Sequence, residues 1–509
     1  MPPGITIVGL GPGGADLWTA AARQILTASR EVWLRTARCP GAETLAQLDG
    51  QSHVRLQLHS FDTWHEEAAG LDSLYDRIAD RVVQLGAREQ GVVYAVPGHP
   101  SVGEATVTRI RALAAEADLP VKTVPGLSCI EPALTALGID VLDGLQVVDA
   151  DQLAAKHHPP LDPDRPALVP QLWNRRQAAQ VKLTLMNSYP DSHHVSLVRA
   201  AGTDQEQTTT CTLLDLDCQP IIDHLTILYL PPVPHPAGLP AFQDTVARLR
   251  APGGCPWDRQ QTHESLRPYL LEESYEVLAA LDAGDTASLL EELGDLLLQI
   301  VLHAQIATES GEFLMADVIG AVDAKLRRRH PHVFGDIEVN SVSEVLVNWE
   351  AIKKAEKAGR TENEGDEQEA APLRSVLEGV PPGMPALARA QAVSERAARV
   401  GFEWPNLQGV LEKIAEEAEE VAAAESPEAR EAEIGDLLFS LVNAARWLGV
   451  DAETALRTTN ERFSWRFRTL ERLAQQRGLN LDDLNIEALD ELWEETKRME
   501  ARASGRMSE

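Results

Sequence analysis

The pattern of apolar and polar positions changes at about residue 230. Before that point, short apolar runs alternate with helical stretches: ITIVGL at residue 5, VVYAVP at 92 and LTILYL at 225 are examples of the runs. Runs of roughly four to eight apolar residues that end in glycine or proline are typical of buried strands. Their alternation with helical stretches such as 71–86 predicts an α/β fold.

Residues 231–240 interrupt both patterns. The segment PPVPHPAGLP has five prolines in ten residues, and proline continues neither a helix nor a central strand. We therefore place a domain boundary here, after an α/β domain at 1–230. Beyond it, apolar residues recur at helical spacing, and the acidic stretch at 358–372 reads as a linker between all-α units at 239–357 and 373–500.

The two helical blocks repeat one sequence. Glu273 and Glu276 of the first correspond to Glu417 and Glu420 of the second, and in each block a Glu-x-x-Asp pair follows, beside a leucine-rich run. KLRRR at 325 parallels RFSWR at 462, and WEAIKKAE at 349 parallels WEETKRME at 493. The same order at similar spacing indicates a duplicated helical unit.

Acidic side chains gather on one face of the expected helices. Residues three or four apart share a helix face, so Glu-Glu-x-x-Glu brings three carboxylates together. The Glu-x-x-Asp pair lies at the edge of an apolar i, i+3, i+4, i+7 stripe and should therefore lie beside the core. About four carboxylates would meet between two such helices, which suits a hard divalent cation such as Mg²⁺; a solvated acidic surface is the alternative. The acids are Glu272, Glu273, Glu276, Glu292 and Asp295 in the first unit, and Glu416, Glu417, Glu420, Glu433 and Asp436 in the second.

Composition restricts the partners. The net charge is −32 and the pI is about 4.8, so the surface opposes binding to nucleic acid polymers or anionic membranes. The five cysteines show no metal-ligand spacing. No apolar run of about 18 residues and no signal-peptide pattern is present. We expect a cytoplasmic protein with no membrane partner.

Basic and aromatic side chains near the acidic helices are candidates for binding a nucleotide. Arginine and lysine suit phosphate oxygens, and tryptophan can stack on a base. The alternatives are pairing with surplus surface acid and packing in a core. The candidates are Lys325 and Arg329 in the first unit, and Lys413, Arg462, Arg466, Trp493 and Lys497 in the second.

These motifs, with GCPWD at 254 and RRRHPHVFGD at 327, resemble the MazG family of nucleoside triphosphate pyrophosphohydrolases over about 239–500. The resemblance implies Mg²⁺-dependent conversion of an NTP or dNTP to NMP and pyrophosphate, removing unwanted or non-canonical nucleotides. It implies a homo-oligomer, a dimer in which helices of paired subunits complete the bundle. The implied metal ligands are Glu417, Glu420, Glu433 and Asp436, and Glu273, Glu276, Glu292 and Asp295. Glu416 or Glu417, and Glu272 or Glu273, would position or deprotonate the attacking water.

The first strand leads into a glycine-rich turn. Gly9, Gly11 and Gly14 fit G-x-G-x-x-G, but the next strand ends in Arg35 rather than an acid, so we discount an NAD site. VGLGPGGADLWTAAA at 8, YAVPGHPSVGEAT at 94 and VPGLSCIEPALTALGI at 124 together resemble the tetrapyrrole methylases. This implies a two-lobed domain with S-adenosylmethionine in the cleft, although His99 stands where the family usually has an acid. The implied lining is Gly9, Gly11, Gly13, Pro97, Gly98, His99, Gly126 and Ser128.

Two other functions remain open at this point. The chain would be a methyltransferase with a helical dimerisation tail if only the front domain binds its ligand. It would be a regulatory or scaffold protein if the acidic helices serve assembly alone. The sequence does not identify the preferred base and sugar, the active unit or the oligomer size.

Overall fold

A computed structural model describes most of the chain. The described residues are 2–49, 56–67, 70–339, 341, 342, 344, 345, 348, 349, 352, 356 and 375–503. The expected linker at 358–372 lies outside them. The chain forms two compact units, and each is described by itself: Met1–Arg267 with Leu298–Met315, and Pro268–Leu297 with Ala316–Glu509.

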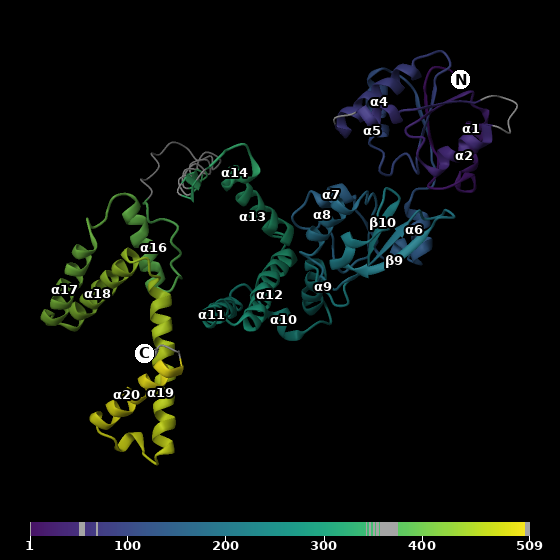
Figure 1. The fold of residues 1–509 in the computed structure, drawn as a ribbon. Coiled ribbons are helices and arrows are strands. Elements are labelled where there is room, and N and C mark those ends of the chain that lie inside the picture. Colours follow the sequence, from purple (N-terminus) through teal and green to yellow (C-terminus); the bar gives the residue numbers. More distant parts are fainter. Residues whose placement is uncertain are drawn as a thin grey trace. The chain divides into compact units, whose positions relative to one another are not determined.

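The first sheet has five parallel strands in the order β3-β2-β4-β1-β5 (Figure 1). Alternate residues of β1 face opposite sides, so Ile5 and Ile7 pack against α4 and α5 while Val8 packs on the side of α1 and α2. The strands are β1 (Ile5–Gly9), β2 (Glu31–Leu34), β3 (Gln57–Ser60), β4 (Val92–Val96) and β5 (Val121–Val124); the helices are α1 (Ala20–Ala28), α2 (Pro40–Asp49), α3 (Asp62–Glu67), α4 (Leu71–Gly86) and α5 (Ala105–Glu116).

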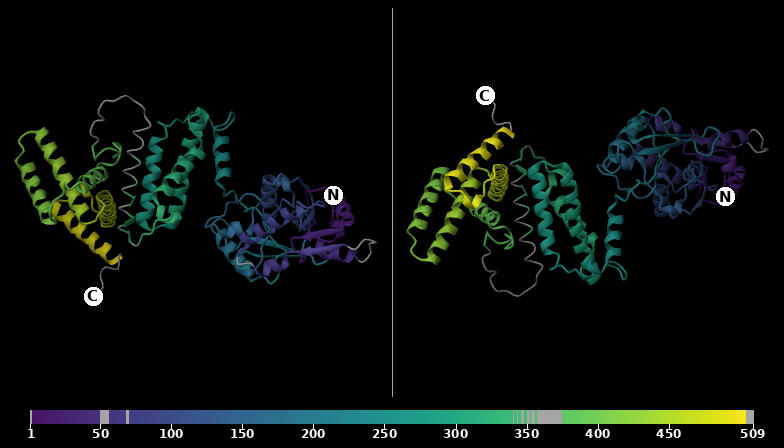
Figure 2. Two further views of the ribbon diagram at one scale, coloured as in Figure 1. Left: turned by 90° about the horizontal axis from the view of Figure 1, so that it is seen from above. Right: turned by 90° about the horizontal axis from the view of Figure 1, so that it is seen from below.

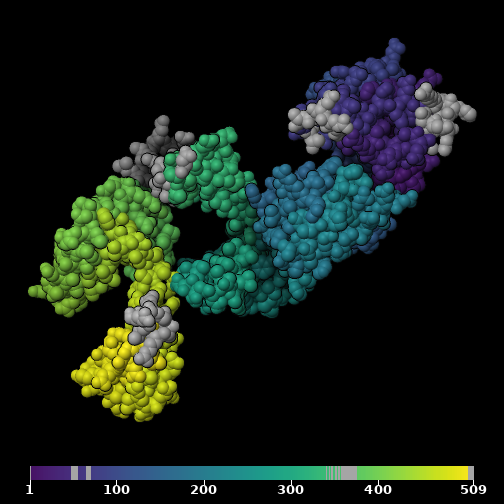
Figure 3. Space-filling view, viewed as in Figure 1, coloured from purple at the N-terminus to yellow at the C-terminus, as the bar shows by residue number. Residues whose placement is uncertain are grey.

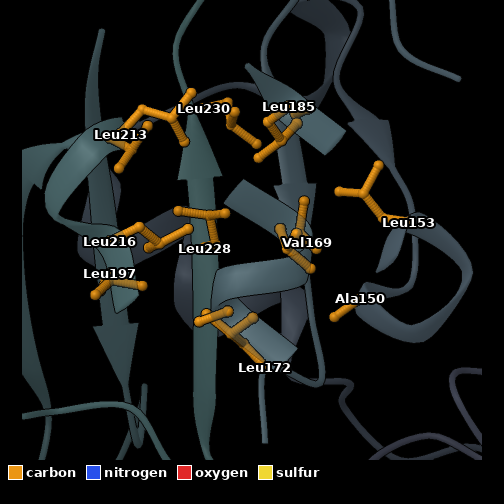
Figure 4. Close-up of a cluster of buried hydrophobic side chains, with 14 of the residues drawn as sticks. Ala150, Leu153, Val169, Leu172, Leu185, Leu197, Leu213, Leu216, Leu228 and Leu230 are labelled. Carbon is orange, nitrogen blue, oxygen red and sulfur yellow. The ribbon is translucent and has the colours of Figure 1, made fainter. Parts of the chain in front are cut away.

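The second sheet is mixed, in the order β6-β7-β10-β8-β9, with only β6 parallel to its neighbour. Leu228 lies at the centre of the core on one face, beneath α7 and α8 (Figure 4). The second face packs against α6. The elements are α6 (Ile130–Leu137), β6 (Gln146–Val147), α7 (Ala150–Ala154), β7 (Ala167–Val169), α8 (Arg175–Leu185), β8 (His194–Arg199), β9 (Gln207–Thr212) and β10 (Thr226–Leu230). The prediction of a two-lobed α/β domain is confirmed.

After β10 the described chain is helical. Polar side chains cap three helices of the second block. Asn406, Ser426 and Asp451 accept hydrogen bonds from backbone N–H groups in the first turns of α17, α18 and α19, respectively. The helices are α9 (Leu239–Arg250), α10 (Pro256–Gln260), α11 (Arg267–Ala283), α12 (Thr286–Ser310), α13 (Met315–Arg329), α14 (Pro331–Phe334), α16 (Ala386–Arg399), α17 (Leu407–Ala423), α18 (Pro427–Trp447), α19 (Ala452–Gln476) and α20 (Ile486–Ala503).

Two helix pairs organise the second block. α17 and α18 lie side by side in the ribbon views (Figures 1 and 2), and α20 packs on α19. The C-terminal part of the chain, which includes α20, is yellow in the space-filling view (Figure 3). Within the described residues, no helix combines the length and apolar character needed to cross a membrane.

The apolar stripes of α12 and α18 are only partly buried. Val301 and Val442 are each 2% exposed, as a core position should be. Leu293, however, is 50% exposed and Ile434 is 48% exposed. Within the described residues of this chain, the apolar stripe of each helix is therefore divided into a buried part and an exposed part. Each helix packs on one side against its own neighbours and leaves the rest of its apolar stripe uncovered.

Glycines allow three strand ends of the first sheet to meet. A Cβ atom on Gly9 would lie 2.6 Å from the Gly98 carbonyl oxygen, and one on Gly126 would lie 2.4 Å from the same atom. Gly11 and Gly98 also exchange backbone hydrogen bonds of 3.2 and 3.0 Å. The loops after β1, β4 and β5 are thereby held together at the carboxyl edge of the sheet, where ligands of open α/β sheets bind.

We predict that Gly126→Ala destabilises the front domain by about 2 kcal/mol, because the new methyl group overlaps backbone atoms that cannot move away independently. Urea unfolding followed by tryptophan fluorescence measures the effect. Gly70→Ala is the matched control, since nothing lies within 4 Å of its added Cβ atom. Equal stability of the two variants would contradict the close approach.

Candidate metal centres and the cleft of the front domain

The second helical block gathers three carboxylates from two helices. Glu417 and Glu420 lie one turn apart on α17, and Glu433 lies on the neighbouring α18. One carboxylate oxygen from each lies within 4.8 Å of the others. Glu420 is exposed, so the group opens to solvent on one side. The i, i+3 spacing therefore produces the predicted cluster once α18 packs on α17.

Glu417 is the anchor of this cluster. It is only 5% exposed, and its Oε1 atom lies 2.9 Å from the Nζ atom of Lys413. Its Oε2 atom is buried and has no hydrogen-bond partner among the described residues. Lys413 also approaches Oε1 of Glu416 at 3.0 Å, and these two hydrogen bonds raise the pKa of the lysine. A buried carboxylate oxygen without a partner is costly unless a cation or a donor joins it.

The first block repeats the arrangement with the same residue types. Glu273 and Glu276 of α11 and Glu292 of α12 bring one oxygen each within 4.8 Å of the others. Burial and then the neighbouring carboxylates Asp295 and Glu276 raise the pKa of Glu273. Burial and then Glu276 and Glu291 raise the pKa of Glu292. Repulsion between neighbouring carboxylates is thus the second cause, after burial, of both raised pKa values.

The predicted fourth ligands lie outside these groups of three. Asp295 is nevertheless near enough to raise the pKa of Glu273 and of Glu292, whereas Asp436 joins neither group. Glu272 and Glu416 lie at the edges of the helix faces that carry the two clusters. The Glu416 side chain is 58% exposed.

The donor sets fit a hard divalent cation. Mg²⁺ prefers oxygen ligands and usually retains several waters, so three carboxylates on one side of the ion suffice. The unpartnered oxygen of Glu417 and the mutual repulsion around Glu273 are both relieved by a cation at the centre of each group. The described residues therefore match the metal chemistry that the sequence suggests.

The candidate phosphate-binding arginines are paired with acids in both blocks. The Nη2 atom of Arg329 lies 2.6 Å from Glu356, and its guanidinium lies 5.7 Å from the Trp349 ring centre. The second block repeats this set: Arg466 lies 2.6 Å from Glu500 and 5.9 Å from the Trp493 ring. The duplication thus extends to a shared Arg–Trp–Glu arrangement. Both arginines thus pair with acids outside the carboxylate clusters: Glu356 lies beyond α14, and Glu500 lies on α20.

The other basic candidates differ in their surroundings. Lys497 lies 2.5 Å from Glu494 on its own helix. Arg462 is exposed, and among the described residues its side chain donates a 3.3 Å hydrogen bond to the Thr459 hydroxyl. Lys325 is exposed on α13. Of the predicted nucleotide-binding residues, Lys413 alone contacts a metal-ligand candidate directly.

The front domain contains a cleft between its two lobes. A cavity of about 180 Å³ adjoins a second of about 770 Å³, and they share Arg35, Tyr75 and Trp173 in their lining. Of the predicted lining residues, Gly11, Pro97, Gly98, His99 and Ser128 reach the smaller cavity. Gly9 and Gly126 instead lie against the Gly98 carbonyl oxygen. Gly13 lies against Leu17 and the Gly202 carbonyl.

An ion pair in this cleft was missed as a site feature. Arg35 Nε lies 2.9 Å from Oε1 of Glu104, and the Glu104 side chain is 5% exposed. Burial raises the pKa of Glu104 to about 7, against the opposing effect of Arg35. The sequence marked Arg35 only as the residue that replaces an acid after β2. Arg35 directly follows the end of β2, which was the available signal for that residue. Glu104 is the residue that precedes α5, and no sequence signal marked it.

In comparisons with known proteins, two family models match different parts of the chain. The family described as MazG nucleotide pyrophosphohydrolase domain matches residues 261–334, and Tetrapyrrole (Corrin/Porphyrin) Methylases matches residues 4–217. The uncharacterized protein YabN of Bacillus subtilis (strain 168) is 39% identical over 512 residues, covering 98% of this chain and 99% of that protein. The nucleoside triphosphate pyrophosphohydrolase/pyrophosphatase MazG of Thermotoga maritima is 47% identical over 259 residues, 50% of this chain and 95% of that protein. A solved uroporphyrin-III-C-methyltransferase from Thermus thermophilus is 20% identical, with 45% of this chain and 93% of that chain covered and a TM-score of 0.35.

We predict that Mg²⁺ raises the Tm of the helical blocks by about 5 °C at a hundredfold excess over its Kd. Glu276→Gln should reduce this increase and, in EDTA at pH 7.5, raise the Tm by about 1–2 °C because one repelling charge is gone.

The metal-free protein should also lose stability as the pH rises. The pKa values of Glu273 and Glu292 are raised above 4.5. The contribution of these two groups to the free energy of unfolding is therefore fully present below that pH and is lost as the pH rises through the raised values. Calorimetric scans from pH 4 to pH 8 measure both effects.

Glu312→Gln is the control, since this exposed residue lies between α12 and α13, outside the cluster. A Mg²⁺-induced increase as large in Glu276→Gln as in Glu312→Gln would place the first ion elsewhere.

Proposed function

Since this chain belongs to the MazG nucleotide pyrophosphohydrolase family and carries a tetrapyrrole methylase-like domain in front of its helical blocks, we propose that it hydrolyses nucleoside triphosphates to NMP and pyrophosphate with Mg²⁺. Residues 239–357 and 373–500 are the two MazG-like units. The biological role is removal of unwanted or non-canonical nucleotides. The cytoplasmic location remains a prediction from sequence.

The observation that carries this proposal is the pair of three-carboxylate clusters at equivalent positions. Repulsion between carboxylates at this distance is unfavourable unless a cation neutralises it. In the second cluster, one oxygen of the buried Glu417 also lacks a partner among the described residues. Such a group is suited to a divalent cation that carries a triphosphate.

The chain's own residues supply the remaining chemistry. A bound Mg²⁺ would neutralise the triphosphate and polarise the phosphoryl group under attack. Glu416 or Glu417 in the second unit, and Glu272 or Glu273 in the first, would hold the attacking water and accept its proton. Lys413 can donate to a phosphate oxygen, and Arg462 is exposed for the same purpose. Trp493 offers a half-buried ring for a base, with Lys497 beside it on α20.

The apolar faces support a homodimer through the helical units. Leu293, Leu297 and Ile300 of α12 are 40–50% exposed, and Ile434, Leu438 and Leu441 of α18 are 47–48% exposed. Leucine and isoleucine side chains repeated along one helix face are typical of a surface that another helix covers. A second copy presents the same faces and can complete the bundle around each metal cluster.

The cleft of the front domain supports a second candidate function, binding of S-adenosylmethionine. Its backbone loops at Gly11 and Gly98 leave room for a ligand at the carboxyl edge of a parallel sheet. Methyl transfer does not follow from binding, because His99 stands in place of the family's usual acid.

We predict pyrophosphate and NMP as products when a panel of NTPs and dNTPs is incubated with Mg²⁺. Hydrolysis in ¹⁸O-labelled water distinguishes attack on the α-phosphorus, which labels NMP, from attack on the β-phosphorus, which labels pyrophosphate. Glu420→Gln combined with Glu276→Gln should lower kcat/KM at least about 10³-fold, because metal-assisted charge stabilisation is lost.

Glu419→Gln is the control, because it removes the same charge from α17 outside the cluster. Full activity in the double variant would show that these carboxylates are not the site. Orthophosphate as the sole inorganic product would show a different reaction.

We predict saturable binding of S-adenosylmethionine to the front domain, measured by calorimetry on the full chain. Val102→Trp should weaken it at least about tenfold, because Val102 lines the smaller cavity and the larger ring fills it. Leu142→Trp is the control at a site 87% exposed in the same domain. Equal affinity in the two variants would place any binding outside this cavity.

A further inference from the structure

The two carboxylate clusters differ at one charged position. Lys413 lies one turn before Glu417 on α17, and its Nζ atom is 2.9 Å from Glu417 and 3.0 Å from Glu416. The repeat places Tyr269 at the equivalent position, one turn before Glu273 on α11. A phenol carries no positive charge near neutral pH. The second cluster therefore has a cation of its own, and the first does not have one at this position.

The geometry of the two clusters is otherwise alike. Each brings one carboxylate oxygen from each of three glutamates within 4.8 Å of the others. The ion pair of Lys413 with Glu417 therefore separates the second cluster from the first.

Lys413 competes with a metal ion for the same carboxylate. Its ammonium group holds Oε1 of Glu417, while Oε2 of that side chain is buried without a partner among the described residues. A divalent cation bound to Glu417 would be repelled by the ammonium group of Lys413, which lies 2.9 Å from that carboxylate. The lysine side chain is 33% exposed and flexible, so it can leave Glu417 when another anion offers it a partner.

We propose that the cluster of Glu273, Glu276 and Glu292 binds a divalent cation by itself, whereas the cluster of Glu417, Glu420 and Glu433 takes its cation together with a triphosphate. The phosphate oxygens supply the acceptor to which Lys413 moves as the metal joins Glu417. This inference rests on the proposed function, and it assigns the two units different orders of binding. Metal and nucleotide bind cooperatively at the second cluster, and by reciprocity each raises the affinity of the other.

Mn²⁺ binding to the full chain without nucleotide tests the proposal, with electron paramagnetic resonance measuring the free ion. In the unmodified protein, one Mn²⁺ should bind more tightly than a second. Glu276→Gln should remove the tight site, and Glu420→Gln should leave it in place. Lys413→Met should strengthen the weaker site about tenfold, since the competing ammonium is gone. Tyr269→Lys should weaken the tight site by a similar factor.

Lys156→Met is the control, because it removes one exposed lysine from the front domain. Circular dichroism in EDTA shows that each variant is folded. A second arm adds a triphosphate with a methylene bridge between the α- and β-phosphorus, which cannot be cleaved there. This analogue should raise the affinity for Mn²⁺ at the site that Glu420→Gln removes. The increase in affinity should be smaller in Lys413→Met.

Two results would overturn the proposal. One is equal Mn²⁺ affinity at both clusters of the unmodified protein without nucleotide. The other is a Lys413→Met variant that binds Mn²⁺ no more tightly than Lys156→Met. Failure of the proposed function looks different: Mn²⁺ binding would then be unchanged by Glu276→Gln and Glu420→Gln in both arms.

Discussion

Repulsion between carboxylates held a few ångströms apart is the constraint on which the helical blocks depend. Glu417, Glu420 and Glu433, and likewise Glu273, Glu276 and Glu292, lie closer together than unpaired acids prefer. Apolar packing of α18 on α17 provides the opposing free energy. Under the proposed function, a cation bound at each cluster would relieve this repulsion, so the free energy of unfolding and the metal affinity would depend on the same side chains.

The second shared feature of the blocks is an arginine held between an acid and a tryptophan. Arg329, the last residue of α13, pairs with Glu356 and lies against Trp349. Arg466, within α19, pairs with Glu500 and lies against Trp493, both on α20. The bidentate character of arginine and its affinity for an aromatic face favour this use. Ionisation of Glu356, whose pKa is lowered to about 2 by its hydrogen bonds to Arg329 and Arg328, keeps the contact formed at neutral pH. An arginine held in this way is positioned in advance and can still present its free N–H groups to a phosphate.

The front domain uses a different physical device. Glycine backbones at the ends of β1, β4 and β5 approach one another closely beside the cleft. The charged pair of Arg35 and Glu104 supplies polarity in the lining. A concave site with a few placed polar groups is the usual form of a site for a small molecule. The cleft and the carboxylate clusters are therefore chemically different features of one chain.

Local periodicity determined much of this protein from sequence alone. Spacing of three and four residues placed Glu273 with Glu276 and Glu417 with Glu420, and the repeat identified their partners on the next helix. The strands at residues 5, 92 and 225 followed from apolar runs that end in turn residues. These features depend on neighbours within one or two turns, which the sequence displays directly. Tertiary packing decided the rest: that Glu417 is buried while Glu420 is exposed, that Arg466 faces Glu500, and that Ile434 remains uncovered. Such outcomes depend on how one helix docks on another, and the contacts that set this docking join residues far apart in the chain.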